Sequence, residues 1–316
     1  MNKKMETLLI FDGHNVALRA YHALSKQSYL LTNKNGQGTW GIYGFFTTLM
    51  HFVNRYNPDK VAITFDWGQS EKRLAIFPEY KANRKFNDPN EVFKRQESRK
   101  QVEILIRLLE IFNIPVLREP NVEADDIIAK LLSLHDGKAI VVSGDHDLRQ
   151  LVTDKITIVK PSIGIKWPED VFDYQKVIET YGVEPNRLAE VWALTGDISD
   201  NVPGVPGIGE KTAVDLLKKY GSLKQILLSD EKKLEGYHAI IDIAYRLIHL
   251  DGSYCNITIP DLNFKPVEPG QNNADMVLEF LDLLDFNSIK NKWIVGQLWF
   301  GNELSVGKPF KKNAIK

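Results

Sequence analysis

Short apolar runs rich in β-branched residues recur through the first half of the chain, with longer helical patterns between them. These runs cover residues 7–11, 60–65, 114–117, 139–143 and 156–159. Each is too short for a typical helix and suits a strand that is buried on both faces. The alternation of strands and helices predicts an α/β fold with a mostly parallel, doubly wound central sheet flanked by helices, over roughly residues 1–165.

The same pattern divides the chain into three parts. Residues 1–172 form the predicted α/β core, with clear helical spacing of apolar positions over residues 40–56 and 102–112. Residues 173–250 lose the strand signal and are predicted to be a helical region. Residues 251–316 form an extension with a Pro/Asn/Gly-rich loop, an amphipathic helix near Asp275–Asp285 and a basic tail with Lys308, Lys311, Lys312 and Lys316.

Residues 67–101 depart from this pattern because they carry few apolar residues and many basic ones. The basic residues are Lys72, Arg73, Lys81, Arg84, Lys85, Lys94, Arg95, Arg99 and Lys100, and the aromatic residues among them are Trp67, Phe77, Tyr80, Phe86 and Phe93. A solvated helical face is one interpretation. The other is a surface that follows a nucleic-acid strand, with cations on phosphates and rings on bases. The position of the segment, directly after a strand that ends in Asp66, favours the second.

The composition narrows the class of protein only moderately. With 43% hydrophobic and 26% charged residues, the 316-residue chain can bury an ordinary globular core. No apolar run approaches the ~20 residues that cross a bilayer, and the apolar start is too short for a signal peptide, so we expect a cytoplasmic protein. The single cysteine, Cys255, excludes an internal disulfide and a thiolate metal site.

Three of the predicted strands lead directly into aspartate. Asp12 follows the first run, Asp66 follows the second, and Asp145 and Asp147 follow the run at residues 139–143. One aspartate in such a place is often a helix cap or a turn former. In a doubly wound sheet, however, functional groups collect at the carboxyl ends of the strands. Three acidic strand ends on one edge therefore favour a functional site.

Two further acidic clusters can join this edge. Glu123, Asp125 and Asp126 stand at the start of a predicted helix, where acids also stabilise the helix dipole. Glu123 and Asp126 are three residues apart and so share one face of that helix. Asp197 and Asp200 repeat the spacing, with the chemistry of an Asx turn as their structural alternative.

Gathered in one place, these nine carboxylates would repel one another, and several would have to take up protons. Hard divalent cations remove that cost. A carboxylate site that receives a phosphate suits two Mg²⁺ ions, with Mn²⁺ able to substitute, and serves displacement at phosphorus between metals ~4 Å apart. The net charge of −1 becomes +8 when these nine negative charges are set aside, so the remaining surface can still attract phosphate.

Seven short motifs occur in a fixed order along the chain: residues 11–15 (FDGHN), 65–66 (FD), 80–84 (YKANR), 123–126 (EADD), 144–148 (GDHDL), 196–201 (GDISDN) and 204–213 (GVPGIGEKTA). In this order and spacing the chain resembles the 5′-nuclease (flap endonuclease) family. The similarity is greatest to the bacterial and phage branch, which includes the N-terminal domain of DNA polymerase I. Every acidic position of the family pattern is filled. Nothing after residue 290 resembles a polymerase, so we expect a free-standing nuclease.

The resemblance implies roles for the acidic residues and for the basic segment. One metal would be served mainly by Asp12, Asp66, Glu123, Asp125 and Asp126, and the second by Asp145, Asp147, Asp197 and Asp200. Residues 67–101 would form a helical arch over the site. In it Lys81 would stabilise charge on the phosphate, Arg84 would grip phosphate, and Tyr80 would stack on a displaced base or, alternatively, pack internally. Arg19 would contact DNA, with a surface salt bridge as its alternative.

The glycine-rich stretch opens a helix predicted over residues 210–220. Its glycines would let backbone amides approach a DNA phosphate at a helix N-terminus. The resemblance implies a helix–three-turn–helix element that binds the duplex and often holds K⁺. Gly207, Gly209, Lys211 and Thr212 are the expected DNA contacts, and a plain packing motif is the alternative.

These interpretations together predict a 5′-3′ exonuclease and flap endonuclease. Its substrates would be branched or 5′-ended DNA and RNA–DNA primer junctions. We expect a monomer that follows a replicative or repair polymerase. A non-catalytic DNA-junction binder is one alternative, but it would be expected to lack metal ligands. A ribonuclease of the related small nuclease fold is the other, and the long basic segment and the glycine-rich element count against it.

Overall fold

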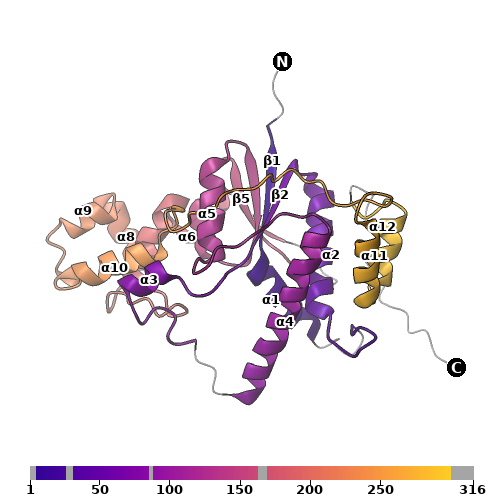
Figure 1. Ribbon diagram of the computed structural model, residues 1–316. Helices are drawn as coiled ribbons and strands as arrows, with labels where there is room; N and C mark the ends of the chain where they lie inside the picture. Colours follow the sequence, from indigo (N-terminus) through magenta and orange to yellow (C-terminus); the bar gives the residue numbers. More distant parts are fainter. Residues whose placement is uncertain (1–4, 26–30, 85–87, 163–168, 300–316) are drawn as a thin grey trace.

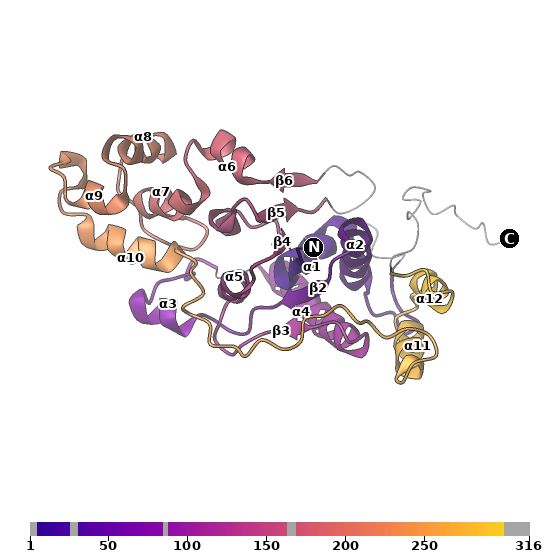
Figure 2. The same ribbon diagram turned by 90° about the horizontal axis from the view of Figure 1, so that it is seen from above.

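A computed structural model of the chain describes residues 5–25, 31–84, 88–162 and 169–299. The predicted basic tail, together with Lys85 and Phe86 of the basic segment, lies outside these residues. A central sheet is flanked by helices on both faces, and a group of helices forms a separate lobe beyond one end of the sheet (Figures 1 and 2). The predicted α/β class and the helical region after it are both confirmed.

The sheet has six strands in the order β3-β2-β1-β4-β5-β6. Their bounds are β1 Thr7–Asp12, β2 Lys60–Thr64, β3 Val116–Leu117, β4 Lys138–Val142, β5 Ile156–Lys160 and β6 Asp170–Phe172. The first five are parallel, as the sequence predicts. β6 pairs antiparallel with β5 and was not predicted, because a three-residue edge strand with two exposed side chains leaves no apolar run.

β1 shows why the central strands are apolar throughout. It lies between β2 and β4, with Leu9 opposite both Val61 and Ile140. Because alternate side chains of a strand point to opposite faces, Leu8 belongs to one hydrophobic core and Leu9 to the other. Both faces are therefore covered, and the position of the strand in the sheet is fixed by burial on each side.

The helices complete the two layers and the lobe. They are α1 (Gly13–Leu24), α2 (Trp40–Tyr56), α3 (Glu71–Ile76), α4 (Pro89–Ile111), α5 (Ala124–Leu134), α6 (Tyr174–Tyr181), α7 (Leu188–Thr195), α8 (Glu210–Tyr220), α9 (Leu223–Leu227), α10 (His238–Ile248), α11 (Ala274–Leu283) and α12 (Asn287–Ile294). One core joins α2 and α4 to the sheet, and the other joins α5 to α7, α8 and α10. None of the described helices is long and apolar enough to span a membrane.

The basic segment contains α3 and the first half of α4. α4 starts earlier than its apolar pattern predicts, because Asp88 caps it through the amide of Asn90 and Pro89 occupies its first turn. The first buried side chain along α4 is Ser98. Figure 1 shows the resulting shape, in which the N-terminal part of α4 projects beyond the body of the molecule.

The C-terminal extension packs on the side of α2 and α4. Two helices, α11 and α12, stand where one helix near residues 275–285 was predicted. Trp293 is almost fully buried against Phe112, and its indole nitrogen donates to the carbonyl of Val267 at 2.9 Å. The short second helix has little amphipathic spacing, so the sequence gives no period by which to find it.

Candidate active site

The predicted acidic edge exists. Asp12 ends β1, and Asp66 and Asp145 come shortly after β2 and β4. These three strands are adjacent in the order β2-β1-β4. β2 pairs with one side of β1 and β4 pairs with the other, so the strand order reverses between β1 and β4. The carboxyl ends of β1 and β4 therefore border the crevice where doubly wound sheets bind their ligands. Three aspartates are therefore brought together by topology alone.

Asp12 is buried at the centre of this edge. Its carboxylate accepts a hydrogen bond from the Ser143 hydroxyl at 2.7 Å and caps α1 through the Asn15 amide at 3.1 Å. The helix-capping alternative is thus also true of this residue. Ser143 was not singled out from the sequence, because its partner lies 131 residues away.

Asp66 and the start of α5 form the second part of the site. Asp66 accepts a hydrogen bond from the Ala124 amide at 2.8 Å, so it caps α5 from a different strand. This contact places Asp125, in the first turn of α5, beside the strand ends. The structure thus gathers Asp12, Asp66 and Asp125 at one edge.

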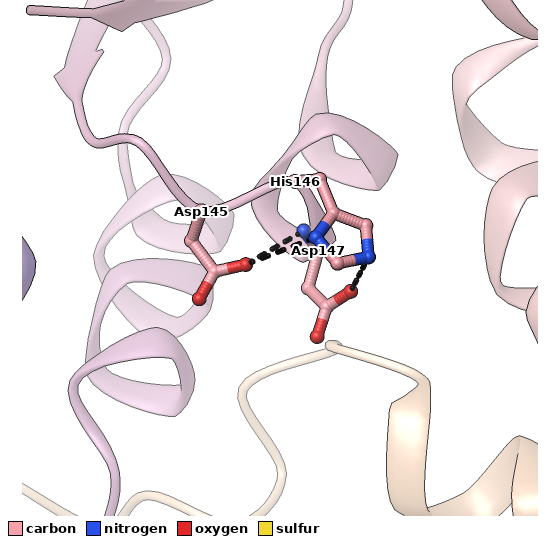
Figure 3. Close-up of side chains that lie close together, drawn as sticks. All are labelled: Asp145, His146 and Asp147. Atoms are coloured by element: carbon pink, nitrogen blue, oxygen red, sulfur yellow. Dashed lines mark hydrogen bonds and ion pairs between the residues drawn. The ribbon is translucent and has the colours of Figure 1, made fainter. Parts of the chain in front are cut away.

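Asp145, His146 and Asp147 make the third part (Figure 3). Asp145 Oδ1 accepts the Asp147 amide at 3.0 Å, and His146 Nε2 lies 3.3 Å from Asp147 Oδ1. The His146 ring rests edge-on against Trp192. One ligand atom from each of the three residues lies within 4.8 Å of the others, which is a spacing that can hold a metal ion.

The loop after α7 adds the remaining acids. Asp147, Asp197 and Asp200 also place one oxygen each within 4.8 Å of one another. The loop is folded on itself, since Asp197 and Val202 exchange backbone hydrogen bonds and Asp197 accepts the Ser199 amide at 2.7 Å. Three of the four residues assigned by resemblance to the second metal are therefore close enough to share an ion, and Asp147 links them to Asp145.

The protonation equilibria of these acids show what the cluster requires. Burial raises the pKa of Asp12 to about 7, and the charges of Asp66 and Asp145 add to the shift. Burial and the charge of Asp145 raise the pKa of Asp147 to about 7, and the same causes hold the pKa of Asp125 well above its ordinary value. The chain itself supplies too little positive charge for these carboxylates. Divalent cations with oxygen ligands fit this donor set.

We expect the metal-free protein to lose stability as the pH rises from about 4 to about 7. In that range the folded protein holds protons on Asp12 and Asp147, whose folded-state pKa is about 7, whereas the unfolded chain with a pKa of 3.8 has released them. Divalent metal should therefore raise Tm more at about pH 8 than at about pH 5, where protons already occupy the site. Thermal unfolding with metal and with chelator at both pH values measures this. An equal rise in Tm at both would contradict the metal assignment.

Two basic residues are paired with acids of the site. Lys81 Nζ lies 2.5 Å from Glu123 Oε1 and 3.4 Å from Asp200 Oδ2, and Arg84 also donates to Asp200. Burial would raise the pKa of Asp200, but Lys81 and Arg84 hold it below its ordinary value. Lys81 has φ +58°, a left-handed conformation that is unfavourable for lysine, and its amide donates to the Asp200 carbonyl at 2.8 Å. The loop of Asp200 thus fixes the Lys81 backbone.

The predicted stacking role of Tyr80 is not supported. Its side chain is 6% exposed, and its hydroxyl lies 3.0 Å from Glu123 Oε2 and 3.1 Å from Asp200 Oδ2. Burial and the charge of Glu123 raise the pKa of Tyr80, so the phenol stays protonated. A buried ring cannot stack on a displaced base, and the packing alternative holds. Tyr80 holds two acids of the site in place.

Arg73 is the residue that the sequence analysis missed. It was counted among the solvated or DNA-facing cations, but it is 2% exposed. Its guanidinium makes a bidentate pair with both oxygens of Asp126 at 2.5 and 3.0 Å, lies 3.1 Å from Glu123, and donates to the Leu247 carbonyl at the end of α10. Both oxygens of Asp126 are thus paired with one guanidinium, which argues against the predicted part of Asp126 in metal binding. We assign it to holding Arg73, which joins α3, α5 and the helical lobe.

Replacing Arg73 with alanine should lower the free energy of unfolding by about 3–5 kcal/mol, because it leaves Asp126 buried and unpaired. Arg73→Lys should recover only part of this, since lysine lacks the planar fork. Urea unfolding measures the loss. Lys72→Ala, at the exposed neighbouring position, is the control and should cost less than ~1 kcal/mol. A loss for Arg73→Ala no larger than that control would refute a structural role for the pair.

The predicted DNA-contact residues lie in two places. Arg19, on α1, donates to the Pro161 carbonyl at 3.3 Å, and none of the ion pairs found among the described residues involves it, so the surface salt-bridge alternative is not seen. Gly207, Gly209 and Lys211 are exposed at the start of α8, and Thr212 is partly buried beside them. They are separate from the acidic edge, in the helical lobe.

The fold and this site define a class of protein: a divalent-metal-dependent nuclease that acts on DNA. The chain belongs to the 5′-3′ exonuclease family. The family model for the 5′-3′ exonuclease N-terminal resolvase-like domain matches residues 7–182, and that for its C-terminal SAM fold matches residues 183–269. The site described above lies within these two matches.

Curated relatives agree with this assignment. The chain is 33% identical over 287 residues to a 5′-3′ exonuclease of Aquifex aeolicus, covering 88% of this chain and 93% of the relative. It is 38% identical over 225 residues to DNA polymerase I of Bacillus subtilis, covering 70% of this chain but only 24% of that polymerase.

Solved structures show the same fold. The phage T5 5′-exonuclease with bound zinc superposes with a TM-score of 0.68 at 20% identity, covering 88% of this chain and 100% of that one. A T5 flap endonuclease with DNA and metal ions superposes with a TM-score of 0.65 at 21% identity, covering 89% and 100%. Flap endonuclease-1 of Methanococcus jannaschii superposes with a TM-score of 0.56 at 21% identity, covering 94% and 92%.

Proposed function

We propose that this exonuclease cuts DNA at 5′ flaps and 5′ ends, leaving a 5′-phosphate and a 3′-hydroxyl, and that it removes RNA primers during replication and repair. The proposal depends on one observation: two cationic side chains are ion-paired with acids of the predicted metal site. The acidic edge of the sheet faces Lys81 and Arg84, which are tied to the same acids, Glu123 and Asp200. A phosphate that takes the place of Glu123 and Asp200 on these cations would be bound by them beside the metal-binding carboxylates.

We assign the acidic edge to two Mg²⁺ ions, with Mn²⁺ as a substitute. When bound, the ions would activate the attacking water and stabilise the leaving oxygen. Asp12, Asp66, Glu123 and Asp125 would hold one, and Asp145, Asp147, Asp197 and Asp200 the other. The pairing of Asp126 with Arg73 removes it from our proposed set. His146 lies beside Asp145 and Asp147 and offers a ring nitrogen as a further ligand.

The cationic residues have separate parts in the reaction. Lys81 is partly buried and paired. Burial would lower its pKa, but Glu123 raises it, so Lys81 stays protonated. An entering phosphate would compete with Glu123 and Asp200 for its three donors. Lys81 would then stabilise charge that develops on the phosphate oxygens, and the half-exposed Arg84 would hold the phosphate in position.

The start of α8 supports a duplex contact. Gly207 has φ +80°, which only glycine adopts freely, and a side chain at Gly209 would meet no atom within 4 Å. Gly209 is thus not required by packing. Its small size instead leaves the first amides of α8 open to a phosphate, and Lys211 is exposed beside them. We propose that this element binds the duplex and holds K⁺ through its carbonyls.

The DNA polymerase I relatives suggest a polymerase as the protein partner of this nuclease. In the DNA polymerase I relatives the matching region is about a quarter of the protein, so we propose that this chain follows a replicative or repair polymerase and acts as a monomer. The element at α8 would read duplex shape rather than base sequence. Flap recognition would then depend on structure alone.

Two flap duplexes of the same sequence, one with a DNA flap and one with an RNA flap, test this proposal with Mg²⁺ present. We expect cutting of both near the branch, and little cutting of a linear single-stranded RNA. A preference for the linear RNA would favour the ribonuclease alternative. Labelling the product ends distinguishes the 5′-phosphate that we expect from a 3′-phosphate.

A further inference from the structure

Trp67 is an exposed aromatic residue at the edge of the site. It follows Asp66 directly and is 48% exposed, although tryptophan is usually well buried. The other described aromatics of the basic segment differ from it: Tyr80 is buried, Phe77 packs against a core, and Phe93 is exposed but lies on the projecting part of α4. Trp67 is therefore the exposed ring closest in sequence to a metal-binding strand end among the described residues of this segment.

The backbone of Trp67 is held firmly. Its amide donates to the Val122 carbonyl at 3.3 Å, and its carbonyl accepts the Asn121 amide at 2.6 Å. Asn121 is itself tied to Glu71 through its side-chain amide at 2.6 Å. Gly68 follows with φ +93°, so the chain turns immediately after the indole. The indole is thus attached to a backbone that hydrogen bonds hold in place.

A cation stands over this ring. Arg118 follows β3 at the same edge of the sheet, and its guanidinium carbon lies 4.9 Å from the centroid of the Trp67 ring. Arg118 also faces Glu103 at 3.8 Å, but both groups are solvated, so that ion pair contributes little. The guanidinium therefore keeps donors available while one side of the ring is covered.

We propose that Trp67 and Arg118 form a nucleotide-binding subsite beside the metal site. This inference rests on the proposed function. The Trp67 ring would stack on one base of the bound DNA strand, and the Arg118 guanidinium would bind the adjoining phosphate. Trp67 directly follows Asp66, and consecutive Cα atoms are ~3.8 Å apart, so the stacked base would lie within about two nucleotides of the phosphate bound at the metal site.

The experiment measures binding and cutting by the full chain on a flap duplex. 2-Aminopurine replaces single bases on either side of the branch, and Ca²⁺ replaces Mg²⁺ for the binding measurement. We expect its fluorescence at one position to be quenched by the wild type and not by Trp67→Ala. Stacking of one base is worth about five- to 150-fold in binding, so Trp67→Ala should raise Kd and KM within that range while kcat changes less than about threefold.

Matched variants separate the subsite from a packing role. Trp67→Phe should restore binding to within about threefold, and Arg118→Ala should weaken binding and reduce its dependence on salt. Tyr174→Ala is the control, because Tyr174 is 40% exposed beside β6 at the opposite edge of the sheet, and it should bind like the wild type.

Unchanged Kd and unchanged aminopurine quenching in Trp67→Ala would overturn the subsite. So would weaker binding that Phe does not restore and that accompanies a lower Tm, because that result describes packing. Binding is measured with Ca²⁺, so its result does not depend on whether the protein cuts the flap with Mg²⁺. A wild-type protein that binds but does not cut with Mg²⁺ contradicts the proposed function, whereas a cutting enzyme with no effect of Trp67→Ala contradicts only the subsite.

Discussion

Replacing Asp125 with asparagine should slow cutting about a thousandfold and at the same time make the metal-free protein more stable. Asp125 stands among Asp12, Asp66, Asp145 and Asp147, and burial together with these charges holds its pKa well above the ordinary value. A bound metal stabilises the transition state by several kcal/mol. Loss of one of its carboxylate ligands should remove much of that stabilisation, which slows the reaction about a thousandfold. The same change relieves repulsion, so Tm at about pH 8 in chelator should rise by a few degrees.

The opposite signs of the two effects make this test specific. A residue that only supports the fold would lose stability and activity together. Asp136→Asn is the control, because Asp136 is an exposed acid on the connection between α5 and β4, and both quantities should stay at the wild-type values. If Asp125→Asn kept its rate, or lowered Tm in chelator, the central place of Asp125 in the acidic site would be wrong.

Lys81→Ala should slow the chemical step about 10²- to 10³-fold, the usual cost of losing one group that stabilises charge in the transition state. Binding of flap DNA should change less than about threefold, because Lys81 is partly buried and already paired with Glu123. Single-turnover rates at saturating enzyme and equilibrium binding with Ca²⁺ separate the two.

Lys138→Ala provides the comparison for this second variant. Lys138 is an exposed cation at the start of β4, at the end of the sheet away from the acids, and its loss should change neither quantity. Equal losses of binding and rate in Lys81→Ala would show that Lys81 contributes to binding the DNA and not to the transition state. Loss of binding with an unchanged rate would lead to the same conclusion.

The parts of the fold that are set by local patterns were predictable. The strands near residues 7, 60, 139 and 156 are short apolar runs, and the helices over residues 40–56 and 210–220 were found at their observed bounds. The acidic edge followed from these strands, because parallel strands bring their carboxyl ends to one side. The places of Asp12, Asp66 and Asp145 could therefore be predicted without knowledge of distant contacts.

The parts that depend on long-range pairing were not predictable. Arg73 and Asp126 are 53 residues apart, and nothing in the sequence near Arg73 distinguishes a buried cation from its solvated neighbours. Tyr80 likewise required knowledge of Glu123 and Asp200 to be recognised as buried. The predicted roles of both residues changed for the same reason: their environment is supplied by other segments of the chain.

Cleavage of a 5′-labelled flap duplex tests the central claim most directly, with Mg²⁺, with Mn²⁺ and with chelator, and with a linear duplex alongside. The acidic edge, Lys81 and the family membership predict cutting near the branch that either metal supports and the chelator abolishes. Tight binding of the flap with no cutting under either metal would contradict the account and would favour a DNA-junction binder instead.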